Sequence, residues 1–287
     1  MSKIRYTLVA LLATLTLAAT AQTAVETPFE YPVAPDTCTT LESRCNYITA
    51  RFWDNYDLSK PIPDDAAFVQ AFRDYVDIFR NAHRNVVKSS IRDLMFKAQA
   101  VTTNMQKIGR VAEYVFYGAN AEFPSDEAYV EFATALMQAS QLSKDEREYY
   151  KSQVMRINAT QPGSPVDLDF VDTAGNKTKL SNVKAPLTIV FFVDENVNSS
   201  MGRTHLSVDL ILNKAIEEGQ LKVVQLYINK PTGDWTTSAP ANWTTGYLDK
   251  GYGILDLRFI PCCFILDENG LLIEKNISVA ELKQSLQ

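Results

Sequence analysis

Cysteines are the residues of this chain that could carry nucleophilic or redox chemistry. Cys38 and Cys45 bracket a six-residue segment, TTLESR, and Cys262 and Cys263 are adjacent. Redox pairs usually have two residues between the thiols and lie at a helix start, where the thiol pKa is lowered. We therefore expect Cys38 and Cys45 to form a local disulfide, or to be two thiols on a first helix. A redox pair is the alternative.

The adjacent cysteines have two interpretations. Neighbouring Cα atoms are about 3.8 Å apart, below the usual disulfide range, so a bond between Cys262 and Cys263 would be strained. Side chains alternate along a strand, so one thiol should face the core and the other the opposite face. The simpler interpretation is two buried, small hydrophobic residues. The alternative is that Cys262 approaches a site as a nucleophile.

Other metal-ligating or catalytic residues are sparse. The chain has two histidines, His83 and His205, far apart in the sequence. Together with this cysteine spacing they do not make a zinc ligand set, so we expect no metal. A lone histidine on a helix is more often solvated than catalytic. No cofactor-binding motif is present either, and we expect no cofactor.

Residues 186–203 form the segment that is expected to position any functional side chains. Residues 187–193 are continuously apolar and rich in β-branched and aromatic side chains, which predicts a strand buried on both faces. A polar loop, residues 194–200, leads into helical spacing from Met201. Ligands of α/β sheets bind beyond the carboxyl ends of the strands, so chemistry is expected in this loop. It contains no cysteine, no histidine and no glycine-rich phosphate cradle.

The segments around this unit predict a complete α/β domain. Further apolar or alternating runs predict strands at 166–171, 221–228, 259–266 and 271–274. A single helix is expected over 201–218, a closing helix over 279–286, and a long loop with Trp235 and Trp243 over 230–252.

The first half of the chain is expected to be helical. Aromatic residues from Phe68 to Phe79 fall at i, i+4, i+7 and i+11, which predicts one apolar helix face. More helical patterns follow to about residue 158, and the segment QPGSP at 161–165 marks a change of periodicity. The expected domains are therefore a helical domain, residues 38–160, and an α/β domain, residues 161–287.

Residues 1–21 have the parts of a secretory signal peptide. Two basic residues precede an apolar segment, residues 7–18, that is too short for a stable membrane span, and Ala19-Thr20-Ala21 supplies a small-x-small cleavage site. A retained anchor is the alternative. Residues 22–37 then form an extended leader. We expect an exported protein, in the periplasm or, alternatively, released.

Composition excludes two classes of partner. The chain has 34 acidic and 28 basic residues and no basic stripe to neutralise phosphates, so no nucleic acid is expected. No second apolar run of membrane length follows the signal peptide, so no membrane span is expected in the mature chain. A polypeptide or another envelope protein is the partner that we expect.

The α/β half resembles the thioredoxin-like fold, and more narrowly the TlpA/ResA branch of exported thiol-disulfide oxidoreductases, in two segments: GSPVDLDFVDTAGNKTKLSNVKAPLTIVFF and FIPCCFILDENGLLIEK. This resemblance covers about residues 162–287. The helical half is similar, in RFWDNYDLS and YVFYGAN…SDEAY, to a domain of unknown function that often precedes such folds in envelope proteins of gut Gram-negative bacteria. The expected fold class is an α/β thioredoxin-like domain preceded by an all-α domain.

The resemblance implies where redox chemistry should be. In that family a C-x-x-C motif follows the equivalent strand, and its first cysteine attacks a disulfide that the second then resolves. In this chain the motif falls on Val197-Asn198-Ser199-Ser200, so Val197 replaces the nucleophile and Ser200 the resolving thiol. A serine here has no adjacent base to activate it. The alternative is a Ser199 or Ser200 nucleophile that is activated by His205, about one helical turn further along.

The same resemblance implies a substrate-binding groove. Pro261 matches the family's cis-proline, which lines the substrate-binding face. The loss of C-x-x-C therefore leaves a groove without its redox motif. Its expected lining residues are Val197, Asn198, Ser199, Ser200, Ile260 and Pro261, and Trp235 and Trp243 are expected beside it.

These observations support two hypotheses. The first is a redox-inactive thioredoxin-fold envelope protein that acts as a polypeptide-binding or scaffold module. The alternative is a thiol-disulfide oxidoreductase with relocated cysteines, either Cys262 or the pair Cys38 and Cys45. The missing motif favours the first hypothesis and a protein without enzyme activity.

Overall fold

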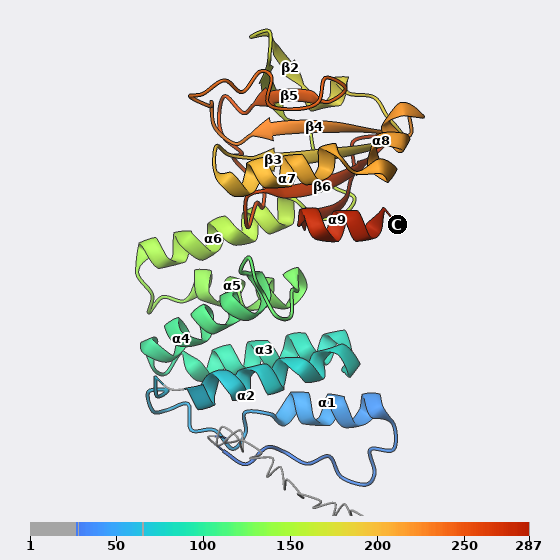
Figure 1. Cartoon of the computed structure of the whole chain (residues 1–287). Helices are drawn as coiled ribbons and strands as arrows, with labels where there is room; N and C mark the ends of the chain where they lie inside the picture. The colour runs from blue at the N-terminus through green and yellow to red at the C-terminus, as the bar shows by residue number, and fades with distance from the viewer. Residues whose placement is uncertain (1–26, 28, 65, 287) are drawn as a thin grey trace, which may run out of the picture.

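The computed structural model describes residues 27, 29–64 and 66–286 (Figure 1). The predicted signal peptide, residues 1–21, lies outside the described residues, as do residues 22–26 and 28 of the leader. Within the part that is described, no helix combines the length and apolar character needed to cross a membrane.

The helical domain is a stack of short helices that lie side by side, from α1 at one end of the molecule to α6 beside the α/β domain (Figure 1). Side-chain caps start several of them: Ser125 accepts the Ala128 amide at α5, and Ser143 forms a capping box with Glu146 at α6. The described elements are α1 Leu41–Arg51, α2 Ala66–Asp77, η1 Ile78–Asn81, α3 Arg84–Ala98, α4 Thr102–Ala112, the π-helix η2 Glu113–Tyr117, α5 Asp126–Gln138 and α6 Lys144–Ala159.

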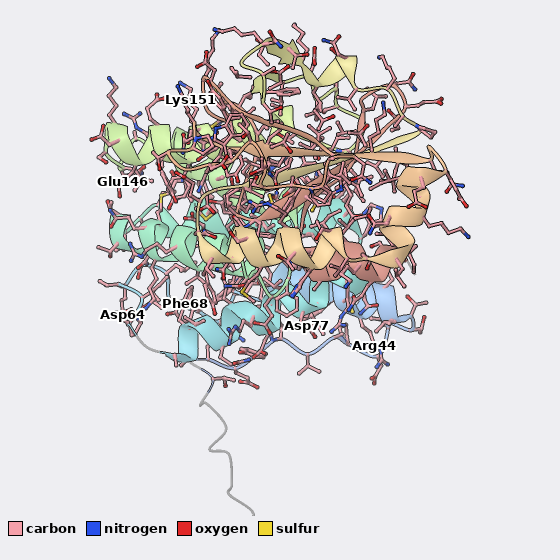
Figure 2. All side chains as sticks on the ribbon, turned by 45° about the horizontal axis from the view of Figure 1, so that its top comes forward. Arg44, Asp64, Phe68, Asp77, Glu146 and Lys151 are labelled. Atoms are coloured by element: carbon pink, nitrogen blue, oxygen red, sulfur yellow. The ribbon has the colours of Figure 1, made fainter. Side chains whose placement is uncertain are left out.

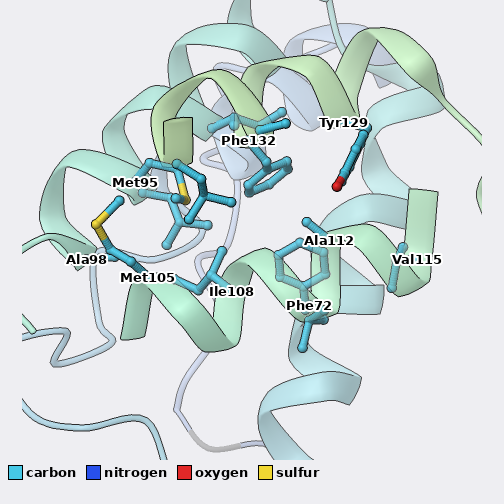
Figure 3. Packing of buried hydrophobic residues seen from close by; sticks show 14 of the residues in the cluster. Phe72, Met95, Ala98, Met105, Ile108, Ala112, Val115, Tyr129 and Phe132 are labelled. Atoms are coloured by element: carbon cyan, nitrogen blue, oxygen red, sulfur yellow. The ribbon is translucent and has the colours of Figure 1, made fainter. Parts of the chain in front are cut away.

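An aromatic core holds these helices together. Phe68, Phe72 and Tyr75 are fully buried, as the aromatic spacing predicts, whereas the helix ends at Asp77 and the last aromatic of the series, Phe79, lies in η1. Phe72 packs on Phe132 of α5, with ring centroids 5.6 Å apart (Figure 3). Such aromatic pairs add stabilisation beyond the area that they bury.

The end of the leader packs against this core. The Phe29 ring lies 5.5 Å from Trp53 and 5.7 Å from Phe52, and the Tyr31 hydroxyl donates to Asp74 at 2.8 Å. Charged residues such as Arg44, Asp77 and Lys151 are exposed at the outer surface (Figure 2).

The α/β domain contains one seven-stranded sheet with the order β2-β1-β5-β4-β3-β6-β7. Strand β3 pairs in parallel with β4 and antiparallel with β6, so it is central and buried on both faces, as its apolar run predicts. The described elements are β1 Asp169–Asp172, β2 Lys177–Lys179, η3 Leu180–Asn182, β3 Leu187–Val193, α7 Val197–Ser207, α8 Leu210–Glu217, β4 Leu221–Tyr227, β5 Thr244–Tyr247, β6 Cys262–Asp267, β7 Leu272–Ile277 and α9 Val279–Ser285.

Helices α7, α8 and α9 cover one face of the sheet. They contribute Leu206, Leu212 and Leu282 to a core with Phe191 of β3. On the opposite face, Phe192 of β3 packs among residues of β1, β4, β6 and the segment that precedes β6. Alternation along β3 therefore serves two separate cores.

Two elements differ from the sequence prediction. The single predicted helix over 201–218 is two helices, because Asp209 accepts the amides of Ile211 and Leu212 and so starts α8. The first of them, α7, begins at Val197, within the predicted loop over 194–200, because Asn196 caps its first turn. The predicted loop over 230–252 contains β5, which pairs with β4 in parallel. Strand β5 also pairs antiparallel with β1, and Gly246 permits this second pairing because a Cβ there would lie 2.6 Å from the carbonyl oxygen of Val171.

Candidate functional site

An open groove of about 890 Å³ lies between the two domains. One wall belongs to the α/β domain and is made by α7, by residues 258–261 before β6, and by the first turns of α9. The other wall belongs to the helical domain and is the loop between η2 and α5, residues 118–121 and 124. The helical domain therefore lines the groove and does not stand apart from it.

Three of the predicted groove residues line this cavity. Asn198 is exposed in the first turn of α7, and Ile260 and Pro261 lie where the chain enters β6. The peptide bond between Ile260 and Pro261 is cis. Gly202 of α7 lies against Pro261, since a Cβ there would be 3.5 Å from the proline ring.

Ser199 was predicted in the groove and is instead fully buried. Its hydroxyl donates to the carboxylate of Asp194 at 2.6 Å and accepts the Asp194 amide at 3.1 Å. Its own amide donates to Asn196, the N-cap of α7, at 2.9 Å. The hydroxyl is thus committed to holding the loop after β3. This corrects its placement as a groove residue and as a nucleophile.

The residues where the resemblance places the C-x-x-C motif are apolar or weakly bonded, and neither Val197 nor Ser200 is among the lining residues of the groove. Val197 begins α7 with 69% of its surface exposed, and Met201, one turn later, is 53% exposed and lines the groove. The Ser200 hydroxyl contacts only the Asn196 carbonyl, at the limiting distance of 3.5 Å, among the bonds of the described residues. His205 lines the groove, and in that same part of the chain no hydrogen bond joins it to Ser200.

The two tryptophans lie outside the groove, contrary to the prediction. Trp243 is buried, with its ring centroid 6.4 Å from that of Phe191. Trp235 packs between Tyr227 and Tyr247, at 6.2 and 5.5 Å. Both belong to the core under α7 and α8. The reason is the unpredicted strand β5, which draws the segment with both rings into the helix-covered side of the sheet.

The two adjacent cysteines are buried on opposite faces of the sheet and do not line the groove. Cys262 belongs to one of the two cores and Cys263 to the other, and neither has exposed surface. Burial raises the pKa of Cys262 to about 12, and burial likewise raises the pKa of Cys263 well above its usual value. Both therefore stay as thiols at neutral pH, and the thiolate is the nucleophile.

The local disulfide considered for Cys38 and Cys45 is not formed, since all four cysteines of the chain are described and free. Cys45 is buried on α1, whereas Cys38 precedes that helix and is half-buried. Cys38 and Cys45 are thus two free thiols in this structure, and the redox pair stays an alternative prediction.

A buried cluster of charges joins the two domains beside the groove. The Asp256 side chain has no exposed surface and lies 2.8 Å from the Arg258 guanidinium and 2.6 Å from the Lys275 ammonium. From the helical domain, the Tyr117 hydroxyl donates to Asp256 at 2.6 Å, and Asp126 pairs with both Arg258 and Lys275. Two acids and two bases thus balance each other across the interface.

Opposing effects set the protonation of this cluster. Burial acts to raise the pKa of Asp256, but the charges of Arg258 and Lys275 outweigh it and hold the pKa below its usual value. Burial and the Asp256 carboxylate raise the pKa of Tyr117, so its phenol remains a donor. The Asp256 amide also donates to Thr160 at 3.2 Å.

Sequence reasoning predicted a loop over 118–125 but missed both this cluster and the place of the loop on the groove. The signal available was the pair Asp256 and Arg258, two charges directly before the apolar entry to β6. Nothing in the sequence indicated that their partners, Tyr117 and Asp126, lie more than a hundred residues away.

Known proteins are similar to both domains. The family model of a domain of unknown function, DUF5106, matches residues 13–159, more than half of the 287-residue chain. The crystal structure of a thioredoxin-like protein from Bacteroides caccae is similar over both domains, with a TM-score of 0.78, 19% identity, and coverage of 91% of this chain and 98% of that chain. The fold is therefore a thioredoxin-like domain preceded by a helical domain.

Two further solved structures match 44% of this chain each. A conserved protein of unknown function from Bacteroides fragilis has a TM-score of 0.41 and 24% identity over 99% of its own length. The thioredoxin domain of a thiol-disulfide oxidoreductase from Bacteroides vulgatus has a TM-score of 0.37 and 16% identity over 95% of its length. No curated protein matches the chain.

Proposed function

The chain belongs to the family of the domain of unknown function DUF5106 and continues into a thioredoxin-like domain, and we propose its function from the groove between these two domains. The protein is an envelope component that binds a segment of polypeptide, either as a binding module or as a scaffold. It does not exchange disulfides.

The observation that carries this proposal is an open groove beside Pro261 that holds no thiol. The positions of the C-x-x-C motif carry Val197 and Ser200, and the cysteines nearest in sequence to the groove are buried in the sheet. A groove that keeps its walls and lacks a nucleophile can hold a chain but cannot attack a disulfide.

The shape of the groove supports a polypeptide as the ligand. Its volume of about 890 Å³ suits a drug-sized molecule or a few residues of extended chain. It is open to solvent, and Met201, Ile260 and Val279 give it apolar surface next to polar Asn198 and Asn276. Extended peptides bind such surfaces through apolar side chains and main-chain hydrogen bonds.

The proposed location is the periplasm, with release from the cell as the alternative. The signal-peptide features of residues 1–21 support export. The proposed partner is accordingly an exported or envelope protein.

Two exposed apolar residues at α7 allow a matched test. Met201 lines the groove, whereas Val208 at the end of the same helix is 65% exposed and lies outside the groove lining. The probe is reduced, carbamidomethylated α-lactalbumin, an unfolded polypeptide without thiols, followed by fluorescence anisotropy. Met201→Arg should weaken binding by about tenfold, equivalent to about 1.4 kcal/mol, and Val208→Arg should leave it unchanged. Equal effects of the two substitutions would refute a ligand site in this groove.

The oxidoreductase alternative has a separate test. Dithiothreitol-driven reduction of insulin is measured with the wild-type protein and with Cys262→Ser. We expect no activity above background in either, because the buried thiol has a raised pKa. Activity that the substitution abolishes would make the protein an enzyme with a relocated nucleophile.

A further inference from the structure

We propose that the loop at residues 118–124 of the helical domain is the second wall of the ligand site, and that the site takes an uncharged, extended polypeptide segment held between the two domains. This inference rests on the proposed function and adds to it the contribution of the helical domain and the chemical class of the ligand.

The loop faces the thioredoxin-like wall across the groove. Residues 118–121 and Pro124 line the same cavity as Met201, Ile260 and Pro261. Small side chains at this part of the loop leave room between the walls: the sequence is Gly-Ala-Asn-Ala at 118–121. A ligand that fills the groove therefore contacts both domains.

Contacts at both ends hold the loop on the thioredoxin-like domain. Tyr117, directly before the loop, donates to Asp256 at 2.6 Å. Asp126, directly after Ser125, pairs with Lys275 at 2.8 Å and with Arg258. Backbone bonds close the base of the loop, from the Phe123 amide to the Val115 carbonyl and from the Ser125 amide to the Phe116 carbonyl. The loop is thus a fixed wall in this structure.

The same cluster also positions the opposite wall. Asp256 and Arg258 directly precede the chain that enters β6 and includes Pro261. Asn276 binds this segment twice, since it accepts the Arg258 amide at 3.1 Å and donates to the Asp256 carbonyl at 2.8 Å. One set of residues therefore sets the separation of the two walls.

The charges around the groove disfavour an acidic ligand. Both lining cations already have counter-charges within the protein: Arg258 pairs with Asp126 and Asp256, and Lys283 lies 3.4 Å from Asp209. The exposed Glu281 carboxylate accepts the neutral Ser278 amide at 2.8 Å in a capping box and keeps its negative charge. An acidic ligand group would therefore lose hydration without gaining a free cation.

The same reasoning favours apolar and amide groups on the ligand. The walls present Ala119, Met201, Ile260 and Val279 beside the amides of Asn120 and Asn198. Apolar side chains gain from burial against the first set, and backbone amides find partners among the second.

Two labelled peptides of equal length test the inference, one built from Ala, Val and Asn and the other with Glu in place of Asn. The purified two-domain protein should bind the uncharged peptide about tenfold more tightly than the acidic one. Ala119→Arg should weaken binding of the uncharged peptide by about tenfold, as should Met201→Arg on the opposite wall. Tyr114→Arg is the matched control, because Tyr114 is 57% exposed just before the loop and outside the groove lining.

The outcomes separate this inference from the proposed function. Loss of binding in Met201→Arg with wild-type binding in Ala119→Arg would overturn the second wall and leave the proposed function standing. Equal or tighter binding of the acidic peptide would overturn the uncharged ligand. No binding of either peptide by the wild-type protein would overturn both proposals. Because Ala119 and Asn120 are both exposed, Asn120→Trp provides a second wall variant should Ala119→Arg fail to fold.

Discussion

Asp256→Asn should be among the most destabilising isosteric changes that this chain can undergo. The carboxylate is completely buried, and it neutralises Arg258 and Lys275, whose side chains are only 10% and 9% exposed. The substitution keeps the shape of the side chain and removes its charge. Two buried cations then share one remaining carboxylate, that of Asp126.

The expected magnitude follows from that imbalance. Removal of one partner from a buried ion pair typically costs about 3–5 kcal/mol, because the remaining charge is left buried without compensation. Asn can still accept a hydrogen bond, so we expect a loss near the lower end, about 3 kcal/mol. For a domain stability of about 5–15 kcal/mol this is a large fraction.

A second aspartate supplies the control. Asp249 pairs with Lys177 at 3.1 Å, but these side chains are 47% and 79% exposed. A solvent-exposed pair contributes about 0–1 kcal/mol, so Asp249→Asn should be nearly neutral. Guanidinium unfolding followed by circular dichroism gives the free energy of unfolding of the wild-type protein and both variants.

The pH dependence of the difference is an independent check. The pKa of Asp256 is lower in the folded protein than in the unfolded chain, where it is about 3.9. The stabilisation is therefore complete above the unfolded pKa and is lost as the pH falls through the folded pKa. The difference in the free energy of unfolding between the wild-type protein and Asp256→Asn should be largest at neutral pH and should decrease below about pH 4.

Hydrogen exchange adds a local measurement. Loss of the cluster should increase amide exchange in the loop at 118–124, whose two ends it holds, before exchange rises in β3. Equal unfolding free energies for Asp256→Asn and Asp249→Asn would refute the reasoning, and so would unchanged exchange in the loop.

Two further substitutions or modifications test the site directly. Ser199→Ala should lower the free energy of unfolding by about 1–3 kcal/mol, because the buried hydrogen bonds to Asp194 are lost. Ser200 is exposed, so Ser200→Ala should change the free energy of unfolding by no more than about 0.5 kcal/mol. Similar losses for both serines would contradict the structural role of Ser199. Iodoacetamide, followed by mass spectrometry, should label Cys262 and Cys263 only after denaturation, since both are buried with raised pKa values; labelling of either in the native protein would mean that the sheet exposes a thiol.

Local sequence patterns predicted much of the fold. The apolar run at Leu187–Val193 predicted a central strand, and the aromatic spacing from Phe68 predicted a buried helix face. The first depends on a continuous apolar run and the second on helical spacing, and both patterns report burial within one element. Strand β5 was not predicted, because Thr244–Tyr247 is four residues long and lies in a segment rich in polar residues. Its pairing with β4 and β1 overrides the local preference of this segment.

By itself, the sequence determined which chemistry is missing. It has no cysteine between Cys45 and Cys262, whatever the fold. The resemblance to the thioredoxin-like fold predicted Asn198 and Pro261 on one groove, and both residues line the cavity between the domains.

Only the tertiary structure decided what surrounds that groove. Tyr117 meets Asp256 across 139 positions in the sequence, and Asp126 meets Arg258 across 132. Periodicity records which side of an element is buried, but it does not record which distant surfaces come together. The wall at 118–124 depends on the packing of one domain against the other, and long-range packing of that kind leaves no repeating signal in the sequence.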